Sequence, residues 1–568
     1  MGEEPALGSL GDGLARGFHV GQKTGRGCPV SGAYNQSPAA ELIGEGVRDM
    51  KVEFQSLPAL WRGLLGGNAG FQAGILPAAR PTGTADVDNA GRNAVVAGQR
   101  PALQGPCQPH PAKGYPSLVM MTVLGVDVGT TGMKLGVYRE TGGGLELVGQ
   151  FSQGYEINTY NNGQFSDVEP EKWQAAFLAG CRDLAPLLGE VDGIGISGTT
   201  PGMTAMDAGG APLYPAILML DQRSRVQAVE IIEKVGLRRI LEETSNMPVA
   251  GGCSLASILW LRDHRPEEYE RAACYGHTNT FFAKWLTGEF AIDPSSASLS
   301  ALYNTVKNDL TWNREIAAAF GVRMEQLPRV MLGFESPGRV RAALARELGF
   351  RREPAVAIGG NDAVLAAYSI GIKEPGDYVD VNGTCEISMV CLDKCYPSTQ
   401  YNIRAHVLAG RWLTLYVMNA EGKAFEWFRS VFCNEMSYER YYHDFMPKAV
   451  DYWLDRESTL TYVPYLMGSR YSQEALKAEF RGMTPETTRE ELMAAMVRGL
   501  AHYQREHLKE ISLVQPIKPV VHVTGGAVNP SLINAKKKWM MAGAEYVFVE
   551  QSSMKGAAML ALKNLQEN

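Results

Sequence analysis

The chain has 568 residues, of which 45% are hydrophobic and 20% are charged, a composition typical of a globular protein with room for two or more domains. Its formal net charge is −7 at pH 7, and the absence of a dense lysine or arginine tract disfavours nucleic acid or an anionic membrane as the main partner. No apolar stretch reaches the ~18 residues of a membrane span, so we expect a cytoplasmic protein.

The nine cysteines lack the paired spacing and neighbouring histidines of a zinc site. Cys391 and Cys395 are close enough in sequence to form a disulfide, but no secretory signal segment precedes them. We therefore expect reduced thiols.

Residues 1–119 differ in composition from the rest of the chain. They hold 21 of the 62 glycines and 11 of the 30 prolines, with short apolar pieces and no sustained period. We expect a disordered or non-native extension, with Met120 or Met121 as the natural start, and a small docking module is the alternative.

From residue 121 the pattern is α/β. Strands are expected at 122–128, 134–139, 146–151 and 193–197, each apolar or alternating and each bounded by glycine or polar turns. A helix is expected after Pro170, with Trp173, Phe177, Cys181 and Leu184 on one face. Further helices are expected over 226–243, 255–263, 491–511 and 555–565. The order β-β-β-α-β-α indicates a mixed sheet covered by helices.

Residues 377–393, DYVDVNGTCEISMVCLD, weakly repeat the strand, Gly-Thr turn and strand of residues 123–138, VLGVDVGTTGMKLGVY. A hairpin tip of glycine and threonine presents N–H groups and hydroxyls that suit phosphate oxygens. Two such tips from two similar domains could bind a polyphosphate between them.

Two motifs resemble those of known protein families. DVGTTGMK (127–134) resembles the first phosphate motif of the actin, Hsp70 and sugar-kinase superfamily. AEFRGM, seven residues and then ELMAAMVR (478–498) resemble the C-terminal signature of the FGGY carbohydrate kinases, except at Arg498, where an acid or amide is usual. Six segments stand in the order seen in xylulokinase-like members: IGISGTTPGMTAMD, PAILMLDQRS, WLTGEFAIDP, AIGGNDAVLAA, VTGGAVNPSL and KGAAMLAL.

The resemblance covers residues 121–568. It implies two RNase H-like domains of the actin-like ATPase type with a cleft between them, at 120–371 and 372–568, after the extension 1–119. It also implies ATP-dependent, Mg²⁺-assisted phosphorylation of a sugar or polyol hydroxyl, with a small-molecule substrate and no nucleic-acid or membrane partner. A homodimer is compatible with the sequence.

In the first hairpin, Asp127 is a candidate Mg²⁺ ligand because hard cations prefer carboxylate and water oxygens. Gly129, Thr130 and Thr131 offer backbone approach and hydroxyl donors, and Lys134 offers a positive charge near the transferred group. The alternative is a plain hairpin turn with a surface lysine.

Asp362, in GGNDAVLAA, matches the position of the family's catalytic aspartate, which implies a general base for the acceptor hydroxyl. The alternative is that Asn361 or Asp362 simply caps the following helix.

The second hairpin contains Gly383 and Thr384, with Cys385 where serine is commoner. After the strand ending at Thr524, a glycine loop resembles the family's adenosine motif. The candidate contacts of the nucleotide there are Gly525, Gly526, Ala527 and Asn529. The alternative is a strand-to-helix loop that needs glycine for its turn, and for KGAAMLAL we favour a packing helix over a nucleotide contact.

The candidate acceptor residues are Thr200, Pro201, Asp221, Arg223 and Asn361. Xylulokinase-like members usually have Gly-Gln-Met-His-Gly where this chain has GTTPG (198–202), and Trp-Asn/Gln-Asp-x-Arg where it has MLDQR (219–223). A polar site rejects ligands that leave its groups unpaired, so these departures favour an acceptor other than D-xylulose. Asp221 and Arg223 could equally be a local ion pair.

Three functions compete on this basis. The first is a sugar kinase for a pentulose, another ketose or a polyol. The second is an actin-like ATPase, and the third is a non-catalytic sugar- or nucleotide-binding descendant of the family.

Overall fold

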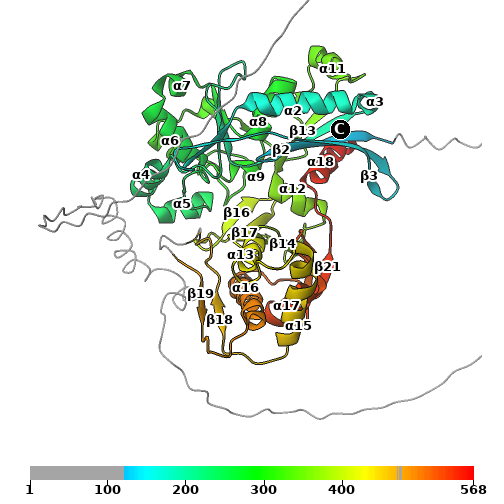
Figure 1. Ribbon diagram of the computed structural model, residues 1–568. Helices are drawn as coiled ribbons and strands as arrows, with labels where there is room; N and C mark the ends of the chain where they lie inside the picture. Colours follow the sequence, from blue (N-terminus) through cyan, green and yellow to red (C-terminus); the bar gives the residue numbers. More distant parts are fainter. Residues whose placement is uncertain (1–119, 470, 472–475) are drawn as a thin grey trace, which may run out of the picture. The chain divides into compact units, whose positions relative to one another are not determined.

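The computed structural model describes residues 120–469, 471 and 476–568, which belong to one compact unit, Ala112–Asn568 (Figure 1). The predicted extension 1–119 lies outside the described residues. Two six-stranded sheets form the centres of the two halves of this unit.

The first sheet has the strand order β12-β13-β6-β1-β2-β3. Strands β1, β2 and β3 form an antiparallel meander, and β6 and β13 run parallel to β1. The bounds are β1 (Thr122–Val128), β2 (Gly132–Thr141), β3 (Gly144–Gly154), β6 (Gly193–Gly198), β12 (Gly338–Arg339) and β13 (Ala355–Asn361). The four strands predicted in this region are confirmed, and β2 and β3 are longer than predicted.

The second sheet has the order β16-β17-β15-β14-β20-β21. Strand β14 is antiparallel to β15, β15 is antiparallel to β17, and β20 and β21 continue in parallel from β14. The bounds are β14 (Tyr378–Asn382), β15 (Glu386–Leu392), β16 (Asn402–Ala405), β17 (Trp412–Met418), β20 (Val520–Thr524) and β21 (Glu545–Phe548). When the edge strands β12 and β16 are left out, the other five strands of each sheet, numbered in chain order, stand in the order third-second-first-fourth-fifth. This shared order confirms the predicted pair of RNase H-like halves.

Helix α2 (Pro170–Asp183) has the buried face that its sequence predicts. Trp173 and Phe177 are fully buried and contact aromatic rings of α8 (Thr278–Thr287), with centroids 5.8 Å apart for Trp173 and Phe281. Leu184 ends the helix and is also buried. This apolar layer fixes α2 and α8 beside the first sheet.

The C-terminal helix α18 (Ser553–Glu567) packs on the first sheet and on α12 (Asp362–Ser369), as Figure 1 shows. A Cβ on Gly195 of β6 would lie 1.9 Å from the carbonyl oxygen of Ala557, and one on Gly556 would lie 2.2 Å from that of Leu365. Such close backbone approach requires glycine, so KGAAMLAL is a packing helix, the alternative that the sequence favours.

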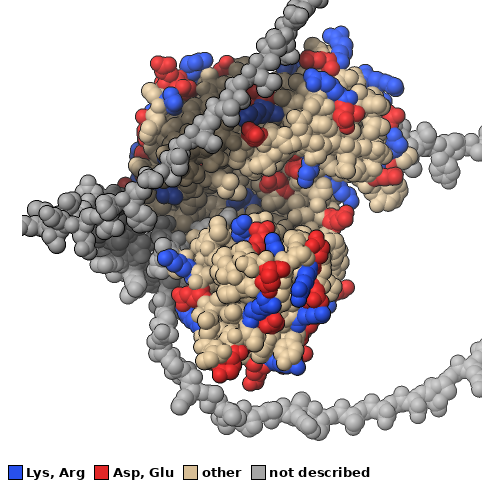
Figure 2. Space-filling model, viewed as in Figure 1, with Lys and Arg blue, Asp and Glu red and all other residues tan. Residues whose placement is uncertain are grey.

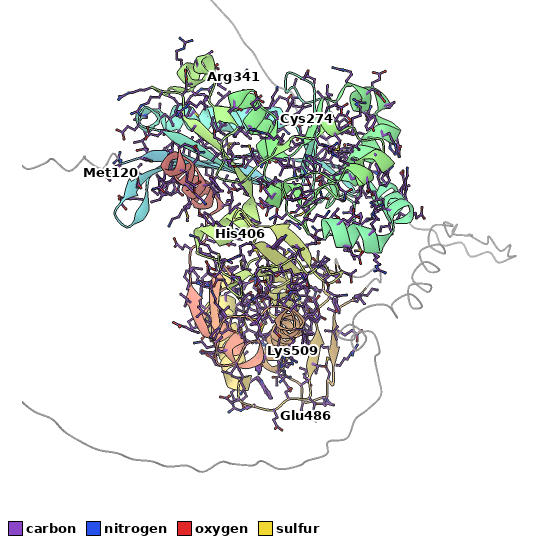
Figure 3. All side chains as sticks on the ribbon, turned by 180° about the vertical axis from the view of Figure 1, so that it is seen from behind. Met120, Cys274, Arg341, His406, Glu486 and Lys509 are labelled. Atoms are coloured by element: carbon purple, nitrogen blue, oxygen red, sulfur yellow. The ribbon has the colours of Figure 1, made fainter. Side chains whose placement is uncertain are left out.

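Strand β16 joins the two halves through its own C-terminal end. His406, which follows β16 and is labelled in Figure 3, is buried, and its Nε2 lies 3.0 Å from the carbonyl oxygen of Ile372. Its ring lies 6.1 Å from that of Tyr368 on α12. The chain segment after α12 is thus fixed to the second sheet. The predicted boundary between 371 and 372 stays a prediction.

Two predicted features of the first half are wrong. Strands β4 (Asn158–Tyr160) and β5 (Phe165–Val168) precede α2, so the order begins with five strands rather than three. The helix predicted over 226–243 is two helices, α4 (Arg225–Val235) and α5 (Leu237–Thr244). Gly236 separates them with φ 88°, a conformation that interrupts a helix and that glycine adopts without strain.

The remaining elements complete the two halves. Strands β4 and β5 belong to a five-stranded sheet with β7 (Gly202–Met206), β8 (Ala216–Leu218) and β9 (Cys274–Gly276). The short strands are β10 (Ala291–Ile292), β11 (Arg329–Val330), β18 (Thr461–Val463) and β19 (Glu479–Arg481). The other helices are α3 (Ala185–Leu188), α6 (Ser254–His264), α7 (Pro266–Arg271), α9 (Pro294–Ala297), α10 (Arg314–Ala319), η3 (Met324–Gln326), α11 (Ala342–Leu348), α13 (Gly422–Phe432), α14 (Tyr438–Arg440), η4 (Tyr441–Phe445), α15 (Met446–Trp453), α16 (Arg489–Ser512) and α17 (Pro530–Trp539).

Arg498, which departs from the family signature, is half-buried on α16. Its Nη2 donates to the carbonyl oxygens of Ser458, at 3.3 Å, and Leu460. Burial lowers the pKa of this guanidinium from its ordinary value. The cation therefore binds the backbone that leads into β18.

The surface and the thiols agree with the composition. Cys391 and Cys395 are buried and are not joined by a disulfide. No helix in the described part of the chain is both long and apolar enough to cross a membrane. On the face shown in Figure 2, lysine and arginine are interspersed with aspartate and glutamate.

Candidate active site

The first hairpin places Asp127 at the carboxyl end of β1. Asp127 is half-buried, and its Oδ1 accepts a 2.8 Å hydrogen bond from Ser197 Oγ on the neighbouring strand β6. In the turn, Gly129 N donates to Gly132 O at 2.9 Å and Thr131 is exposed, as is Lys134 near the start of β2. Thr130 Oγ1 lies 3.1 Å from Thr199 Oγ1. The turn thus carries exposed donors beside a fixed carboxylate.

Asp362 lies at the same edge of the first sheet. The parallel strands β1, β6 and β13 bring Asp127 opposite Ser197 and Gly198 opposite Asn361. Since the carboxyl ends of parallel strands meet at one edge, the first residue of α12 lies near the first hairpin. The sequence prediction that Asp127 and Asp362 share one site therefore agrees with the strand register.

The surroundings of Asp362 change its acidity. Asp362 is half-buried at the start of α12. Burial, followed by the negative charge of Asp127, raises the pKa of Asp362 to about 7, although the N–H of Ala363 and the charge of Arg404 oppose the rise. A carboxyl group with this pKa can take up or release a proton near neutral pH.

The same two residues also begin α12. Asn361 is the N-cap, and its Oδ1 accepts from Val364 N at 3.2 Å. Asp362 Oδ1 accepts from Ala363 N at 2.7 Å and from Asn361 Nδ2 at 3.1 Å. Asn361 therefore caps the helix, as the alternative states. The hydrogen bonds that Asp362 accepts here involve one of its two carboxyl oxygens.

The predicted acceptor residues fall into two groups. Thr200 belongs with Asn361, whose Nδ2 donates to Thr200 Oγ1 at 2.7 Å. Thr200 Oγ1 also donates to Gly198 O at 3.1 Å, and the buried Pro201 follows it before β7. These residues lie beside Asp362.

Asp221 and Arg223 form a buried ion pair, with Arg223 Nε 2.8 Å from Asp221 Oδ2. Arg223 Nη2 also donates to Asp167 Oδ2 of β5 at 2.7 Å, and its guanidinium lies 4.5 Å from the ring centroid of Phe165. Asp221 Oδ2 further accepts from Ser166 N at 2.6 Å. Asp221 and Arg223 therefore form the local ion pair that was one of the two alternatives. A substrate contact of either residue, the other alternative, stays a prediction.

The second hairpin and the glycine loop leave one edge of the second sheet. Val381 of β14 lies opposite Thr524 of β20, so Gly383 and Gly525 follow neighbouring parallel strands. Ala527 N donates to Asn382 O at 3.3 Å. The loops that the sequence assigns to phosphate and adenosine are therefore adjacent.

Individual positions of these loops have structural roles. Gly525 has φ 111°, and a Cβ there would lie 1.9 Å from Asn382 O, so the strand-to-helix turn itself requires glycine. Gly526 has open space around its Cα. Asn529 caps α17 by accepting from Leu532 N at 3.0 Å, and Cys385 Sγ donates to Asn419 O at 3.2 Å.

The sequence patterns missed four residues of this region. Ser197 holds Asp127, Thr199 contacts Thr130, and Gly422 N donates to Gly383 O at 3.0 Å. Arg404 of β16 is buried close enough to Asp362 to lower its pKa. The alternation of buried strands could have suggested Ser197, but no local pattern marks Arg404, which comes from the other half.

The donor set fits a Mg²⁺ ion that keeps most of its water. No cluster of three or more histidine, cysteine, aspartate or glutamate side chains suited to a metal occurs among residues 120–469, 471 and 476–568. Mg²⁺ commonly binds one or two carboxylates together with water and substrate phosphates. Asp127, half-buried beside exposed hydroxyl groups, satisfies that requirement.

Comparison with known proteins agrees with this geometry. Residues 122–369 match the FGGY family of carbohydrate kinases, N-terminal domain. Residues 122–369 are therefore an N-terminal domain of the FGGY family, and the comparisons support a carbohydrate kinase, a phosphotransferase with an alcohol group as acceptor.

Within that family the chain is xylulokinase-like. It is 26% identical over 451 residues to a xylulose kinase of Lactococcus lactis, covering 78% of this chain and 87% of the relative. It is 24% identical over 391 residues to a gluconokinase of Bacillus subtilis, covering 67% and 75%. A solved xylulose kinase from Rhodospirillum rubrum has a TM-score of 0.71 at 21% identity, covering 78% and 89%, which supports the shared fold.

Proposed function

We propose that the chain transfers the γ-phosphate of ATP to a hydroxyl group of a sugar, which is a pentulose, another ketose or a polyol, with Asp362 as general base and Mg²⁺ bound near Asp127. The observation that carries this proposal is the placement of Asp362, whose pKa is raised to about 7 beside the hairpin of Asp127. A carboxylate with that pKa can accept the proton of an alcohol as its oxygen attacks phosphorus.

The remaining proposed roles follow from what phosphoryl transfer requires, which is positioning and charge compensation. Gly129, Thr130 and Thr131 provide donors to phosphate oxygens, and Lys134 provides a positive charge. Bound Mg²⁺ supplies further charge compensation to those oxygens. On the other side, the proposed nucleotide contacts are Gly383, Thr384, Gly525, Gly526, Ala527 and Asn529.

The proposed acceptor is a sugar or polyol other than D-xylulose. The relatives include proteins named xylulose kinase and gluconokinase, so acceptors differ among similar chains. The loop 198–202 offers Thr200, already bonded to Asn361, and the apolar Pro201. A site with these groups suits a different pattern of hydroxyls from one built with glutamine and histidine.

A phosphotransfer screen tests the function. Residues 1–568 are incubated with ATP and Mg²⁺ against ketoses, aldoses and polyols, and ADP release and phosphorylated product are measured. Acceptor-dependent ADP release that EDTA abolishes and added Mg²⁺ restores is the expected result. Acceptor-independent ATP turnover would indicate an actin-like ATPase, and sugar binding without turnover would indicate a non-catalytic descendant. Either of these results contradicts the proposal.

A further inference from the structure

A buried charged cluster lies beneath the second hairpin. Lys536 Nζ of α17 donates to Asp380 Oδ2 at 2.6 Å, to Glu386 Oε1 at 2.5 Å and to Asn382 Oδ1, and lies 3.4 Å from Glu421 Oε1. The side chain of Lys536 is 7% exposed and those of the three acids are 0–3% exposed. We call these five residues the lysine cluster. An ammonium group has three donors, and all three are used.

Four members of the cluster lie on elements that adjoin a proposed phosphate or nucleotide loop, and the fifth, Glu421, contacts the second hairpin. Asp380 and Asn382 end β14 before the hairpin 383–385, and Glu386 begins β15 after it. Glu421 precedes α13, and its backbone N–H donates to Thr384 O at 3.2 Å. Lys536 lies on α17, the helix that follows the glycine loop 525–529. One side chain thus binds both ends of the hairpin.

The cluster also fixes the glycine loop 525–529 through Asn382. Its side chain accepts from Lys536, while its carbonyl oxygen accepts from Ala527 N at 3.3 Å. From the opposite direction, Gly422 N and Lys423 N donate to Gly383 O and Thr384 O at 3.0 and 3.2 Å. The backbone carbonyls of the hairpin are therefore held by the start of α13, and its base is held by Lys536.

Charge balance indicates that the cluster contributes geometry more than stability. Three carboxyl groups face one ammonium group, and replacing a buried ion cluster by apolar side chains is often neutral or stabilising. Burial is the largest cause that raises the pKa of Glu421 to about 7 and that of Glu386 well above its ordinary value. Glu421 Oε2 and Asp380 Oδ1 are buried without a hydrogen-bond partner among the described residues. Burying these charged groups costs folding free energy that an apolar core would avoid. What the cluster provides instead is a set of directional hydrogen bonds.

We propose that Lys536 is a positioning residue for nucleotide binding, which orients the hairpin 383–385 relative to the loop 525–529 so that both meet one polyphosphate. This inference rests on the proposed use of ATP. The ligand class is a nucleoside triphosphate, and Lys536 acts through Asn382 and Glu386 without touching the ligand. The acceptor site at Thr200 and Asp362 belongs to the first half and is not part of the cluster.

Lys536→Met tests the proposal, and Lys537→Met is its matched control. Lys537 is the next residue of the same helix and is exposed. ATP affinity is measured by calorimetry, and KM for ATP, KM for the acceptor and kcat are measured on the full chain. We expect Lys536→Met to weaken ATP binding about tenfold or more and to leave the acceptor KM within about twofold. Lys537→Met should change none of these values.

A purely structural role gives a different result. If Lys536 only stabilises the fold, Lys536→Met lowers kcat in proportion to the folded fraction and leaves both KM values unchanged, which overturns the proposal. Should that variant fail to fold, Lys536→Met combined with Glu386→Gln removes one charge of each sign and is measured in the same way. Unaltered ATP affinity in the folded double variant also overturns it. A wild-type chain that binds no ATP would instead contradict the proposed function itself.

Discussion

Asp362 combines two chemical requirements in one position. The residue begins α12 and accepts the Ala363 N–H, which stabilises its negative charge, yet burial and Asp127 raise its pKa to about 7. Loss of a helix-end hydrogen bond costs about 1 kcal/mol, whereas loss of a general base typically costs ~10²-fold or more in rate. The two roles are therefore separable by experiment.

Replacing Asp362 should abolish turnover and retain the fold. We expect Asp362→Ala and Asp362→Asn to lower kcat by about 10²-fold or more, with circular dichroism and gel filtration unchanged. For the wild-type chain, kcat/KM should fall about tenfold per pH unit below the pKa of Asp362, because protonation removes the base. This pKa is about 7 without metal, and Mg²⁺ at Asp127 lowers it by offsetting the charge of that carboxylate. A variant with near-normal kcat, or a wild-type profile that does not fall at acidic pH, would refute the assignment.

The raised pKa of Asp362 also predicts the sign of a stability change. The native chain keeps a proton that the unfolded chain releases above its ordinary value of 3.8, so stability decreases as pH rises from about 4 to about 7. Asparagine carries no charge, and Asp362→Asn should therefore be more stable than the wild-type chain at pH 8, by on the order of 1–3 kcal/mol. Chemical denaturation at pH 8 and pH 4 measures the difference, which should vanish at the lower pH.

At the scale of elements, the loop before α17 contains a structural glycine and an open one. Gly525→Ala places a Cβ 1.9 Å from Asn382 O at φ 111° and should destabilise the chain by about 2 kcal/mol or more. Gly526→Ala meets no atom within 4 Å and should change stability by less than about 0.5 kcal/mol.

Binding separates the two glycines further. If the backbone of Gly526 approaches the nucleotide, Gly526→Ala raises KM for ATP while its Tm stays that of the wild type. Thermal unfolding and ATP-dependent kinetics on both variants check this pair. Equal Tm values for the two variants would contradict the structural role of Gly525, and an unchanged KM for Gly526→Ala would remove that residue from the nucleotide site.

Elements with strong local patterns were predictable, and those fixed by distant contacts were not. The two hairpins and α2 carry regular apolar spacing and glycine turns, so their sequences predict them. Strands β4 and β5 are short, and the pairing of β5 with β8 depends on residues about 50 positions away. The apolar period runs without interruption through the sequences of α4 and α5. Gly236 is the one residue in it that signals the break between the two helices.

The candidate site shows the same division. The motifs around Asp127, Asp362, Gly383 and Gly525 are local and could be found from the sequence. Arg404, which acts on Asp362, and Asp167, which binds Arg223, become neighbours through folding alone. Lys536 reads as one of three successive lysines on α17, and its burial beneath the second hairpin has no local signal.

At the scale of the whole molecule, repeated topology explains how two glycine-threonine hairpins arise in one chain. The strands β1 and β14 occupy equivalent central positions in the two sheets, and each is followed by a hairpin at its carboxyl end. Helix α18, from the end of the chain, packs on β6 of the first sheet. Residues 120–371 contain every strand of the first sheet but lack the helix packed on it, and in isolation they should not fold stably.

Every residue proposed for catalysis, binding or positioning lies between Asp127 and Lys536, and the family match begins at residue 122. A chain that begins at Met120 should therefore keep kcat and both KM values of the 568-residue chain within about twofold, with the same Tm, because it retains both hairpins, Asp362 and the lysine cluster. Kinetics with ATP and the acceptor found in the screen, together with thermal unfolding, measure this.

A chain ending at Glu550, which lacks α18, is the matched truncation and should lose stability and activity together, since Gly125, Gly195 and Leu365 then lose the backbone packed against them. Loss of activity in the chain from Met120 would instead show that residues 1–119 contribute to the enzyme.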